Sequence, residues 1–239
     1  MTKRVEQKDK FIWELHAHTS PVSRCSEVSP EECVAAYAAL PYDGIVLTNH
    51  FEPSLLQRFK TAADCAEWYL ADFKRAEKAG RQYGIHVLLG MEVRFSENNN
   101  DYLVYGRIDR RYVERAFAFL DRGLHAFYQA MHQEDVLIVQ AHPFRDGMER
   151  AALQDIDGIE AFNMHPNHNS RVAVASRYAK EYDLLITAGT DFHHPGHQGL
   201  GGTLFSENPR DGAALVQLLR ERRYAFLIGG RMTEPYEEK

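Results

Sequence analysis

The sequence predicts an α/β fold of one domain, in which short apolar strands alternate with helices. Apolar runs recur between longer amphipathic stretches, and this alternation is typical of βαβ units with a parallel sheet. The 239 residues, 44% of them hydrophobic, can bury the core of one α/β barrel. Metal-ligand side chains also follow nearly every apolar run, as at the functional end of such a barrel. We therefore expect one domain over residues 1–239, with flexible tails at 1–9 and 231–239.

The chain order of the elements follows from the apolar runs and the helix signals between them. Strands are predicted at residues 11–15, 44–48, 86–91, 103–108, 136–140, 158–162, 184–187 and 224–228. Helices are predicted at residues 30–40, 54–83, 111–132, 170–182 and 209–222. Ser29 before Pro30 is a helix start, because serine caps a helix and proline fits its first turn, while Gly84 ends the longest helix. The glycine-rich segment 196–202 predicts a loop.

The composition limits the class of partner. A net charge of -6 does not favour a broad cationic surface for duplex nucleic acid, but it is compatible with a small anionic substrate. The N-terminal residues lack the apolar core of a signal peptide, and no apolar run approaches the ~20 residues that span a bilayer. The three cysteines, Cys25, Cys33 and Cys65, form no CxxC pair, which suits a reducing compartment. We expect a cytoplasmic protein with no membrane partner; the oligomeric state stays open.

Side chains that bind metals lie directly after the predicted strands. His16 and His18 are two residues apart, so on a strand their rings point to the same face. Alone, this pair is as compatible with ordinary packing as with a metal site. The later strands end in His50, Glu92, His142, Asn163, Asp191 and His193. Because parallel strands end at one rim, these side chains predict a hydrolytic centre for zinc, manganese or iron.

Five short motifs mark the ends of these strands. They are ELHAHT at residues 14–19, TNH at 48–50, GME at 90–92, AHP at 141–143 and GTDFH at 189–193. In order and spacing they resemble the motifs of the PHP family (polymerase and histidinol phosphatase domain), and the resemblance spans nearly the whole chain. It implies a distorted (β/α)7 TIM-like barrel that hydrolyses phosphoesters with two or three divalent ions, zinc, manganese or iron.

The same resemblance implies a ligand for each ion. The implied ligands are His16, His18, Glu92 and Asp191 for one ion, Glu92 and His142 for a second, and His50 and His193 for a third. A metal-bound hydroxide would attack phosphorus in line while the cations stabilise the phosphoryl oxygens. Asp191 and His193 would support this reaction.

The chain departs from the family pattern at three places. Asn49 stands where the second motif usually has Asp, so an acid beside the ligands is neutral here. Arg24 stands where members with three metals often have His; either the adjacent Cys25 substitutes as a thiolate ligand, or the third ion is weakly bound or absent. No histidine clearly matches the one that follows the glutamate motif. Asp101 is the nearest candidate for that ligand, and His125, within a predicted helix, is a poorer one.

Substrate contacts are predicted from charge and position. A guanidinium matches phosphate bidentately, which makes Arg24 and Arg145 the first candidates. Asn163 and His165 follow a strand at the same rim and can bond substrate, although a polar turn explains them equally well.

Three functions are compatible with these residues. The leading hypothesis is a metal-dependent phosphoesterase that acts on a small phosphorylated metabolite or a nucleotide. One alternative is a 3'-5' exonuclease or other oligonucleotide end hydrolase, which needs a basic or aromatic groove that the acidic balance does not favour. The other is a non-catalytic metal-binding PHP module, which Asn49 and Arg24 keep open.

Overall fold

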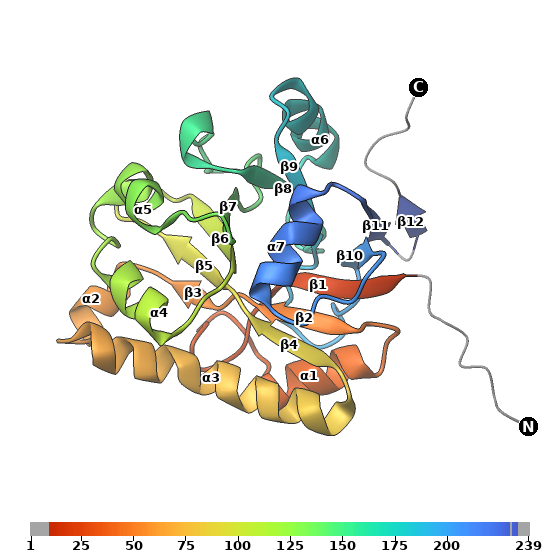
Figure 1. Ribbon diagram of the computed structural model, residues 1–239, viewed down its shortest axis with the longest axis horizontal. Coiled ribbons are helices and arrows are strands. Elements are labelled where there is room, and N and C mark those ends of the chain that lie inside the picture. The colour runs from red at the N-terminus through yellow and green to blue at the C-terminus, as the bar shows by residue number, and fades with distance from the viewer. Residues whose placement is uncertain (1–9, 230, 234–239) are drawn as a thin grey trace, which may run out of the picture.

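The computed structural model describes residues 10–229 and 231–233, which form a mixed α/β fold (Figure 1). Its strands are β1 (Phe11–Ala17), β2 (Gly44–Leu47), β3 (His50–Phe51), β4 (His86–Leu89), β5 (Met91–Arg94), β6 (Asp101–Gly106), β7 (Val136–Gln140), β8 (Gly158–Asn163), β9 (Leu185–Gly189), β10 (Gly201–Phe205), β11 (Tyr224–Ile228) and β12 (Arg231–Thr233). Its helices are α1 (Pro30–Ala38), α2 (Ser54–Arg58), α3 (Ala62–Tyr83), α4 (Arg110–Phe117), α5 (Gly123–Met131), α6 (Val172–Glu181) and α7 (Gly212–Arg220), with a 3-10 turn at Leu153–Asp155. The α/β prediction is confirmed.

The strands form two six-stranded sheets that meet as a distorted barrel. Their orders are β12-β11-β10-β1-β2-β4 and β3-β5-β6-β7-β8-β9. On one side, the path through β4 and β5 changes sheet at Gly90, since β4 pairs with β2 while β5 pairs with β3 and β6. On the other side, Ala17 at the end of β1 forms a parallel bridge with Phe192, just after β9. The strands follow one another around the barrel in the order β1, β2 with β3, β4 with β5, β6, β7, β8 and β9, although the two sheets are not joined by continuous pairing. β6 runs antiparallel to both of its neighbours.

The helices begin and end where the local chemistry requires. Ser29 forms a reciprocal capping box with Glu32 at the start of α1, as its position before a proline predicts. The predicted helix over 54–83 is two helices, because Phe59 adopts an extended backbone and Thr61 caps the new start of α3. Gly84 ends α3 with a φ of 75°, which a residue without a Cβ adopts at little cost. The predicted helix over 111–132 likewise divides into α4 and α5.

The strands differ from the prediction in several places: β3 was not predicted, and β6 lies two residues earlier than the strand predicted over 103–108. The strand predicted over 86–91 is interrupted at Gly90, where a Cβ would lie 2.7 Å from a methyl carbon of Val46, so glycine permits the close passage. The last two residues of the loop predicted over 196–202 instead begin β10, which pairs antiparallel with β1 and β11. Residues 231–233 of the predicted tail instead form β12 on the edge of β11, where main-chain hydrogen bonds are available. Residues 1–9, 230 and 234–239 lie outside the described part.

The hydrophobic core fills the barrel and the space under the helices. Trp13, Tyr105 and Phe127 are fully buried within it.

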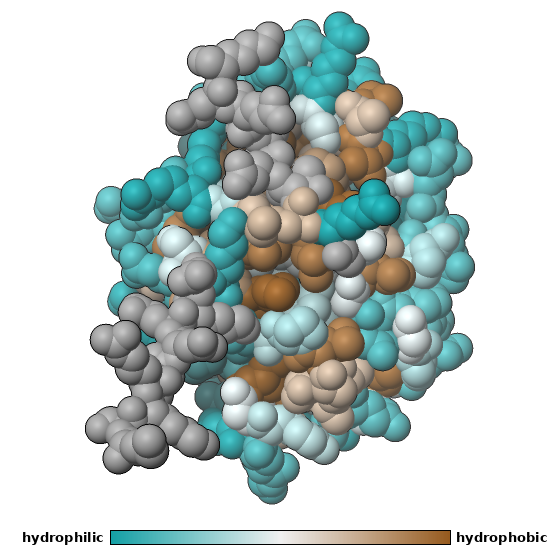
Figure 2. All heavy atoms as spheres, turned by 90° about the vertical axis from the view of Figure 1, so that its right-hand side faces the viewer, coloured by the Kyte–Doolittle hydropathy of each residue, from teal (hydrophilic) through white to brown (hydrophobic). Residues whose placement is uncertain are grey.

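Figure 1 shows α1 and α3 along one side of the sheets and α6 at the opposite side. Figure 2 shows apolar side chains among polar ones on the face that carries β10 to β12. In the described residues, no helix combines the length and apolar character needed to cross a membrane.

Candidate metal centre

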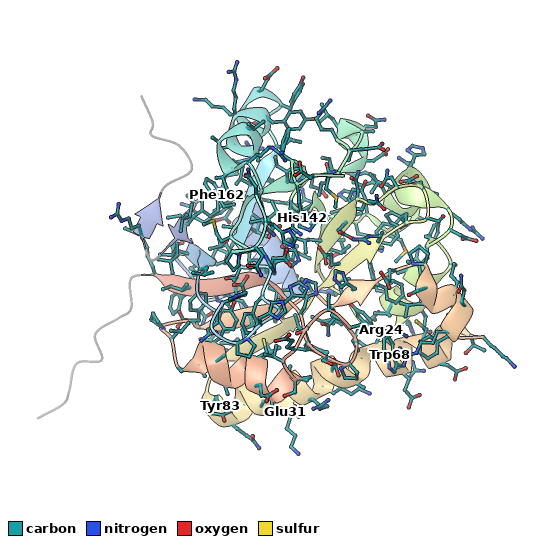
Figure 3. The ribbon with its side chains drawn as sticks, turned by 180° about the vertical axis from the view of Figure 1, so that it is seen from behind. Arg24, Glu31, Trp68, Tyr83, His142 and Phe162 are labelled. Atoms are coloured by element: carbon teal, nitrogen blue, oxygen red, sulfur yellow. The ribbon has the colours of Figure 1, made fainter. Side chains whose placement is uncertain are left out.

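The predicted metal ligands meet at the carboxyl ends of the parallel strands. His16 lies near the end of β1 and His18 directly follows the strand, and their ring centres lie 4.9 Å apart. The ring of His18 also stacks 4.2 Å from His193 and lies 4.5 Å from His50, although these residues come from different strands. Figure 3 places His142 near the middle of the molecule, where several strands end. The rim predicted from the sequence is therefore one cluster in space.

Glu92 lies at the centre of this cluster. Its Oε1 atom lies 3.1 Å from His16 Nε2 and 3.4 Å from His142 Nε2. Its Oε2 atom lies 2.7 Å from His50 Nδ1 and 3.4 Å from His18 Nε2. The carboxylate thus faces four imidazoles, two through each oxygen, which is the arrangement that a bridging carboxylate needs.

The carboxylate of Asp191 lies beside His16 and His18, as a second acid of the cluster. Its Oδ1 atom lies 3.4 Å from the Nε2 atoms of both His16 and His18, and 3.3 Å from His193 Nδ1. Asp191 and His142 both adopt a positive φ, 58° and 32°, which is costly for residues with a side chain. The left-handed backbone at two predicted ligands is typical of a functional site.

Hydrogen bonds on the outer side of two histidines fix which ring nitrogen faces the cluster. His16 Nδ1 lies 2.9 Å from the buried carboxylate of Glu160, which can only accept, so the proton is on Nδ1. His18 Nδ1 lies 3.1 Å from Ser23 Oγ, which itself donates to Asn49 Oδ1 at 2.9 Å. The serine proton is thereby used, and His18 donates to the serine. When both rings are neutral, as metal binding requires, their Nε2 atoms present lone pairs to the cluster.

The donor set fits divalent cations. Both Nε2 atoms of His16 and His18, and both oxygens of Glu92, are buried and have no hydrogen-bond partner among the described residues. The ring of His18 stays neutral, so its Nε2 lone pair faces Glu92 Oε2 across 3.4 Å and repels it unless a cation lies between them. Two ligand atoms bound to one ion at about 2.0–2.2 Å lie about 3.0–3.5 Å apart, so the spacing suits a shared ion.

Three overlapping groups in the described part of the chain have ligand atoms within 4.8 Å of one another. They are His16, His18 and Asp191; His18, His50 and His193; and His50, Glu92 and Asp101. The overlap through His18 and His50 is the arrangement of a centre that shares ligands between neighbouring ions.

The electrostatics of the cluster keep its carboxylates charged and one imidazole neutral. Burial, together with the nearby His193 and His50, holds the pKa of His18 well below its usual range. Burial opposes the charge of Glu92, but His16 and His50 outweigh it and hold the pKa of Glu92 well below its usual range. A neutral imidazole and an ionised carboxylate are the protonation states that bind metals.

Two predicted ligands occupy different surroundings. Asp101 forms a bidentate ion pair with Arg94, at 2.8 and 2.7 Å, and its carboxylate lies 3.9 Å from His142 Nε2. It therefore already has one cationic partner. Cys25 is exposed at the mouth of the cluster; burial of its sulfur raises its pKa, but hydrogen bonds with His193 and His50 outweigh this and lower that pKa to about 6. The poorer candidate, His125, contacts Asp155 elsewhere, at 2.8 Å.

Asn49 supports the first loop of the site. Its Oδ1 accepts from the backbone N–H of Thr19 at 2.7 Å as well as from Ser23, and its Nδ2 donates to Thr19 Oγ1 at 2.9 Å. The Thr19 hydroxyl in turn donates to the buried carboxylate of Asp72 at 3.1 Å. An amide, which both donates and accepts, is required by these partners, and the acid of this network lies at Asp72.

The predicted substrate contacts separate into two places. Arg145 lies at the cluster, where it donates to Asp191 Oδ2 at 2.7 Å and to Asn163 Oδ1 at 2.9 Å, and its buried Nε has no partner among the described residues. Asn163 also donates to Asp191 and Glu160. His165 lines the same cavity; burial lowers its pKa to about 4. Arg24 does not line this cavity.

The cavity above the cluster has a volume of about 320 Å³. It is lined by Cys25, His50, Glu92, Arg94, Asp101, His142, Arg145, Met148, His165, Asn167, His168, Asp191, His193 and His194. Its size suits a phosphoryl group with a small leaving group.

Glu160 and Ser23 are supporting residues that the sequence interpretation missed. Glu160 orients His16 and accepts from the backbone N–H of His142 at 3.3 Å. A lone acid within the apolar run of β8 was the available signal, because a buried carboxylate needs partners. Ser23 had no such signal, since serine is common in any loop.

Comparisons with known proteins agree with this geometry. The PHP domain model matches residues 14–220. A search of curated protein sequences finds no match. Among solved structures, a two-domain protein from Bacteroides vulgatus that contains a predicted PHP-like metal-dependent phosphoesterase is similar with a TM-score of 0.66 and 16% identity, over 93% of this chain and 66% of that chain. This chain thus spans about two thirds of that protein.

Two further structures share the fold. A protein from Bifidobacterium adolescentis described as a candidate metal-dependent phosphoesterase has a TM-score of 0.52 and 17% identity, over 87% of this chain and 95% of that chain. The lesion-specific endonuclease PfuEndoQ from Pyrococcus furiosus has a TM-score of 0.59 and 13% identity, over 91% of this chain and 58% of that chain. The family match, the distorted barrel and the histidine-carboxylate cluster agree: the chain belongs to the PHP family.

Proposed function

We propose that this protein is a metal-dependent phosphoesterase that hydrolyses a small phosphorylated metabolite or nucleotide. The observation that carries the proposal is the set of buried, unpartnered nitrogen and oxygen atoms around Glu92, which bound cations would neutralise and coordinate. The proposed metal ligands are His16, His18, His50, Glu92, His142, Asp191 and His193, with Cys25 and Asp101 at the edges of the centre.

The bound ions would lower the pKa of a coordinated water and neutralise charge on the phosphoryl oxygens. The chain's own residues prepare the site for that reaction. Glu160 and Ser23 hold His16 and His18 in the tautomers that bind metal. Arg145 keeps Asp191 in place, and its free Nε–H is available to a phosphoryl oxygen. In the reaction, water adds to phosphorus, the bond to the leaving oxygen breaks, and the alcohol is released with a proton.

His165 is a hydrogen-bonding group rather than a cation in this proposal. Its lowered pKa, about 4, leaves the ring neutral at neutral pH. Its Nδ1 accepts from the backbone N–H of Asn167 at 3.2 Å, so the proton is on Nε2. A neutral donor on the cavity wall can bind a phosphate oxygen without competing with the metals for ligands.

Phosphate release from a panel of phosphomonoesters and nucleotides, with zinc, manganese or iron supplied in turn, tests this proposal. We expect hydrolysis of at least one small phosphoester, and its loss in His16→Ala. Hydrolysis confined to oligonucleotide ends, with salt-dependent binding, would instead identify the nuclease. A fully metal-loaded protein that hydrolyses nothing in the panel would identify the non-catalytic module.

A further inference from the structure

A second cavity adjoins the metal cavity. It has a volume of about 350 Å³ and is lined by Val22, Arg24, Cys25, His50, Glu52, Ser54, Leu55, Arg58, Trp68 and Arg94. Cys25, His50 and Arg94 line both cavities, so the two share one wall. A molecule whose phosphoryl group lies at the metals can therefore extend past Cys25 into the second cavity.

The two cavities differ in how their arginines are neutralised. In the metal cavity, Arg145 is paired with Asp191 and Arg94 with Asp101. In the second cavity, Arg24 has no ion pair and no hydrogen bond to a carboxylate within the part of the chain that the structure describes.

The same holds for Arg58, which is exposed like Arg24. The acid in this lining, Glu52, accepts from Ser54 Oγ at 2.7 Å and pairs with neither arginine among the described residues. The second cavity thus presents two guanidinium groups that form no ion pair within the described part of the chain, against one carboxylate.

Trp68 holds one of these charges in a defined position. The guanidinium of Arg58 stacks over the Trp68 ring at 4.0 Å from its centre and lies 5.2 Å from the ring of Phe59. Stacking fixes the plane of the guanidinium while its N–H groups at the edge stay free to bind an anion. Figure 3 shows Arg24 and Trp68 close together on the same side of the molecule.

We infer that the substrate carries a second anionic group, a phosphate or a carboxylate, which Arg24 and Arg58 bind while the scissile phosphate lies at the metals. This inference rests on the proposed phosphoesterase function and names the class of its substrate. It also gives Arg24 a different role from the one the sequence predicts, because Arg24 contacts the far end of the substrate rather than the phosphate that reacts.

A matched series of substrates tests the inference. Propyl, butyl and hexyl monophosphates that end in a hydroxyl, a carboxylate or a second phosphate differ only in the remote group and its distance. With metal-loaded wild-type protein, we expect the KM of the best doubly anionic substrate to be about 10- to 100-fold below that of its hydroxyl counterpart, as hydrogen bonds between charged groups allow. The two anionic ends distinguish a phosphate site from a carboxylate site.

Two variants locate the effect. In Arg58→Ala and Arg24→Ala, the advantage of the doubly anionic substrate should fall by about tenfold or more. Arg122→Ala is the matched control, since this exposed arginine also lies over an aromatic ring, at 5.5 Å from the centre of Phe119, but lines neither cavity. It should keep the full preference. An equal KM for hydroxyl and anionic substrates in the wild type, or a preference that survives in both variants, would overturn the inference.

A binding measurement separates this inference from the proposed function. Calorimetric titration of the metal-loaded protein with the corresponding alkyl phosphonates, which are not hydrolysed, reports affinity without turnover. If the doubly anionic phosphonate binds more tightly, this advantage depends on Arg58 and no ester is hydrolysed, the second binding site is supported and the proposed enzymatic activity is wrong. If the esters are hydrolysed but doubly anionic substrates are not preferred over hydroxyl-terminated ones, the enzymatic activity is supported and the second site is wrong.

Discussion

The two ends of the barrel both hold a cavity with histidine and arginine, yet their polar atoms differ. At the carboxyl ends of the strands, the Nε2 atoms of His16 and His18 and both oxygens of Glu92 lack hydrogen-bond partners among the described residues. At the opposite end, a cavity of about 530 Å³ is lined by His86 at the start of β4. There Arg210 donates to His86 Nε2 at 2.9 Å, and the ring stacks on Trp13, 6.2 Å between centres.

This difference separates a metal site from a structural contact better than cavity size or residue type. The larger cavity has a satisfied histidine, whereas the smaller one has histidines that need a cation. A polar atom that the fold buries without a partner marks a place where something else binds.

Replacement of a proposed metal ligand should have the largest effect on the difference between the two ends of the barrel. In His16→Ala or Asp191→Asn we expect bound metal to fall below that of wild type and hydrolysis to drop by more than the ~10- to 100-fold typical of residues around the ligands. Metal content by atomic emission and phosphate release measure this. His86→Ala is the control at the other end and should keep both. A ligand variant with wild-type metal content and activity would contradict the assignment.

Glu160→Gln should have the next largest effect. The amide can accept or donate at His16 Nδ1, so the tautomer that places the lone pair toward the metals is no longer enforced. We expect metal affinity to weaken by about 10- to 100-fold with the fold retained. Competition with a metal-binding dye gives the affinity. The exposed Glu221→Gln is a matched control, and an equal change in both variants would argue against the role of Glu160.

Removal of metal should lower the stability of the whole barrel. Ions that bind only the folded state stabilise it by about 2.7 kcal/mol at a concentration one hundred times their dissociation constant. The unfolding temperature should therefore fall on chelation and recover when zinc or manganese returns. The same treatment of His16→Ala should give a smaller shift. Identical unfolding temperatures with and without chelator would count against a bound cation.

His86 provides the smallest effect, a pH dependence at the other end. Burial and the nearby Arg210 lower the pKa of His86 below its ordinary value of 6.5. As pH falls below 6.5, the unfolded chain takes up a proton that the folded chain resists, so the stability contributed by His86 is present above this value and declines below it. The unfolding temperature of the wild type relative to His86→Gln should therefore decrease as pH falls. A difference that is constant with pH would reject this.

The alternation of strands and helices was predictable because apolar periodicity reports burial directly. The same holds for His16, Glu92 and Asp191, since a ligand after each parallel strand must reach the common rim. β10 was not predictable, because its two initial glycines carry no strand signal and its register depends on β1 and β11.

The surroundings of the ligands were less predictable than the ligands. Arg24 follows the first motif by only a few residues, yet the loop turns it into the second cavity. Ser23 and Asn49 interact through a hydrogen bond between loops that lie 26 residues apart in the sequence. Such contacts depend on loop conformation, which residue types alone do not specify.

Gly90 has a consequence for how the centre can vary. Glu92 lies only two residues beyond it, so the position of the carboxylate that four imidazoles face depends on a residue with no side chain. A Cβ at that point would contact Val46 at 2.7 Å and Thr48 at 2.9 Å and displace β5 relative to β2. A side chain at position 90 would therefore change the distance between Glu92 and the histidines at the end of β1 without altering any residue of the cluster.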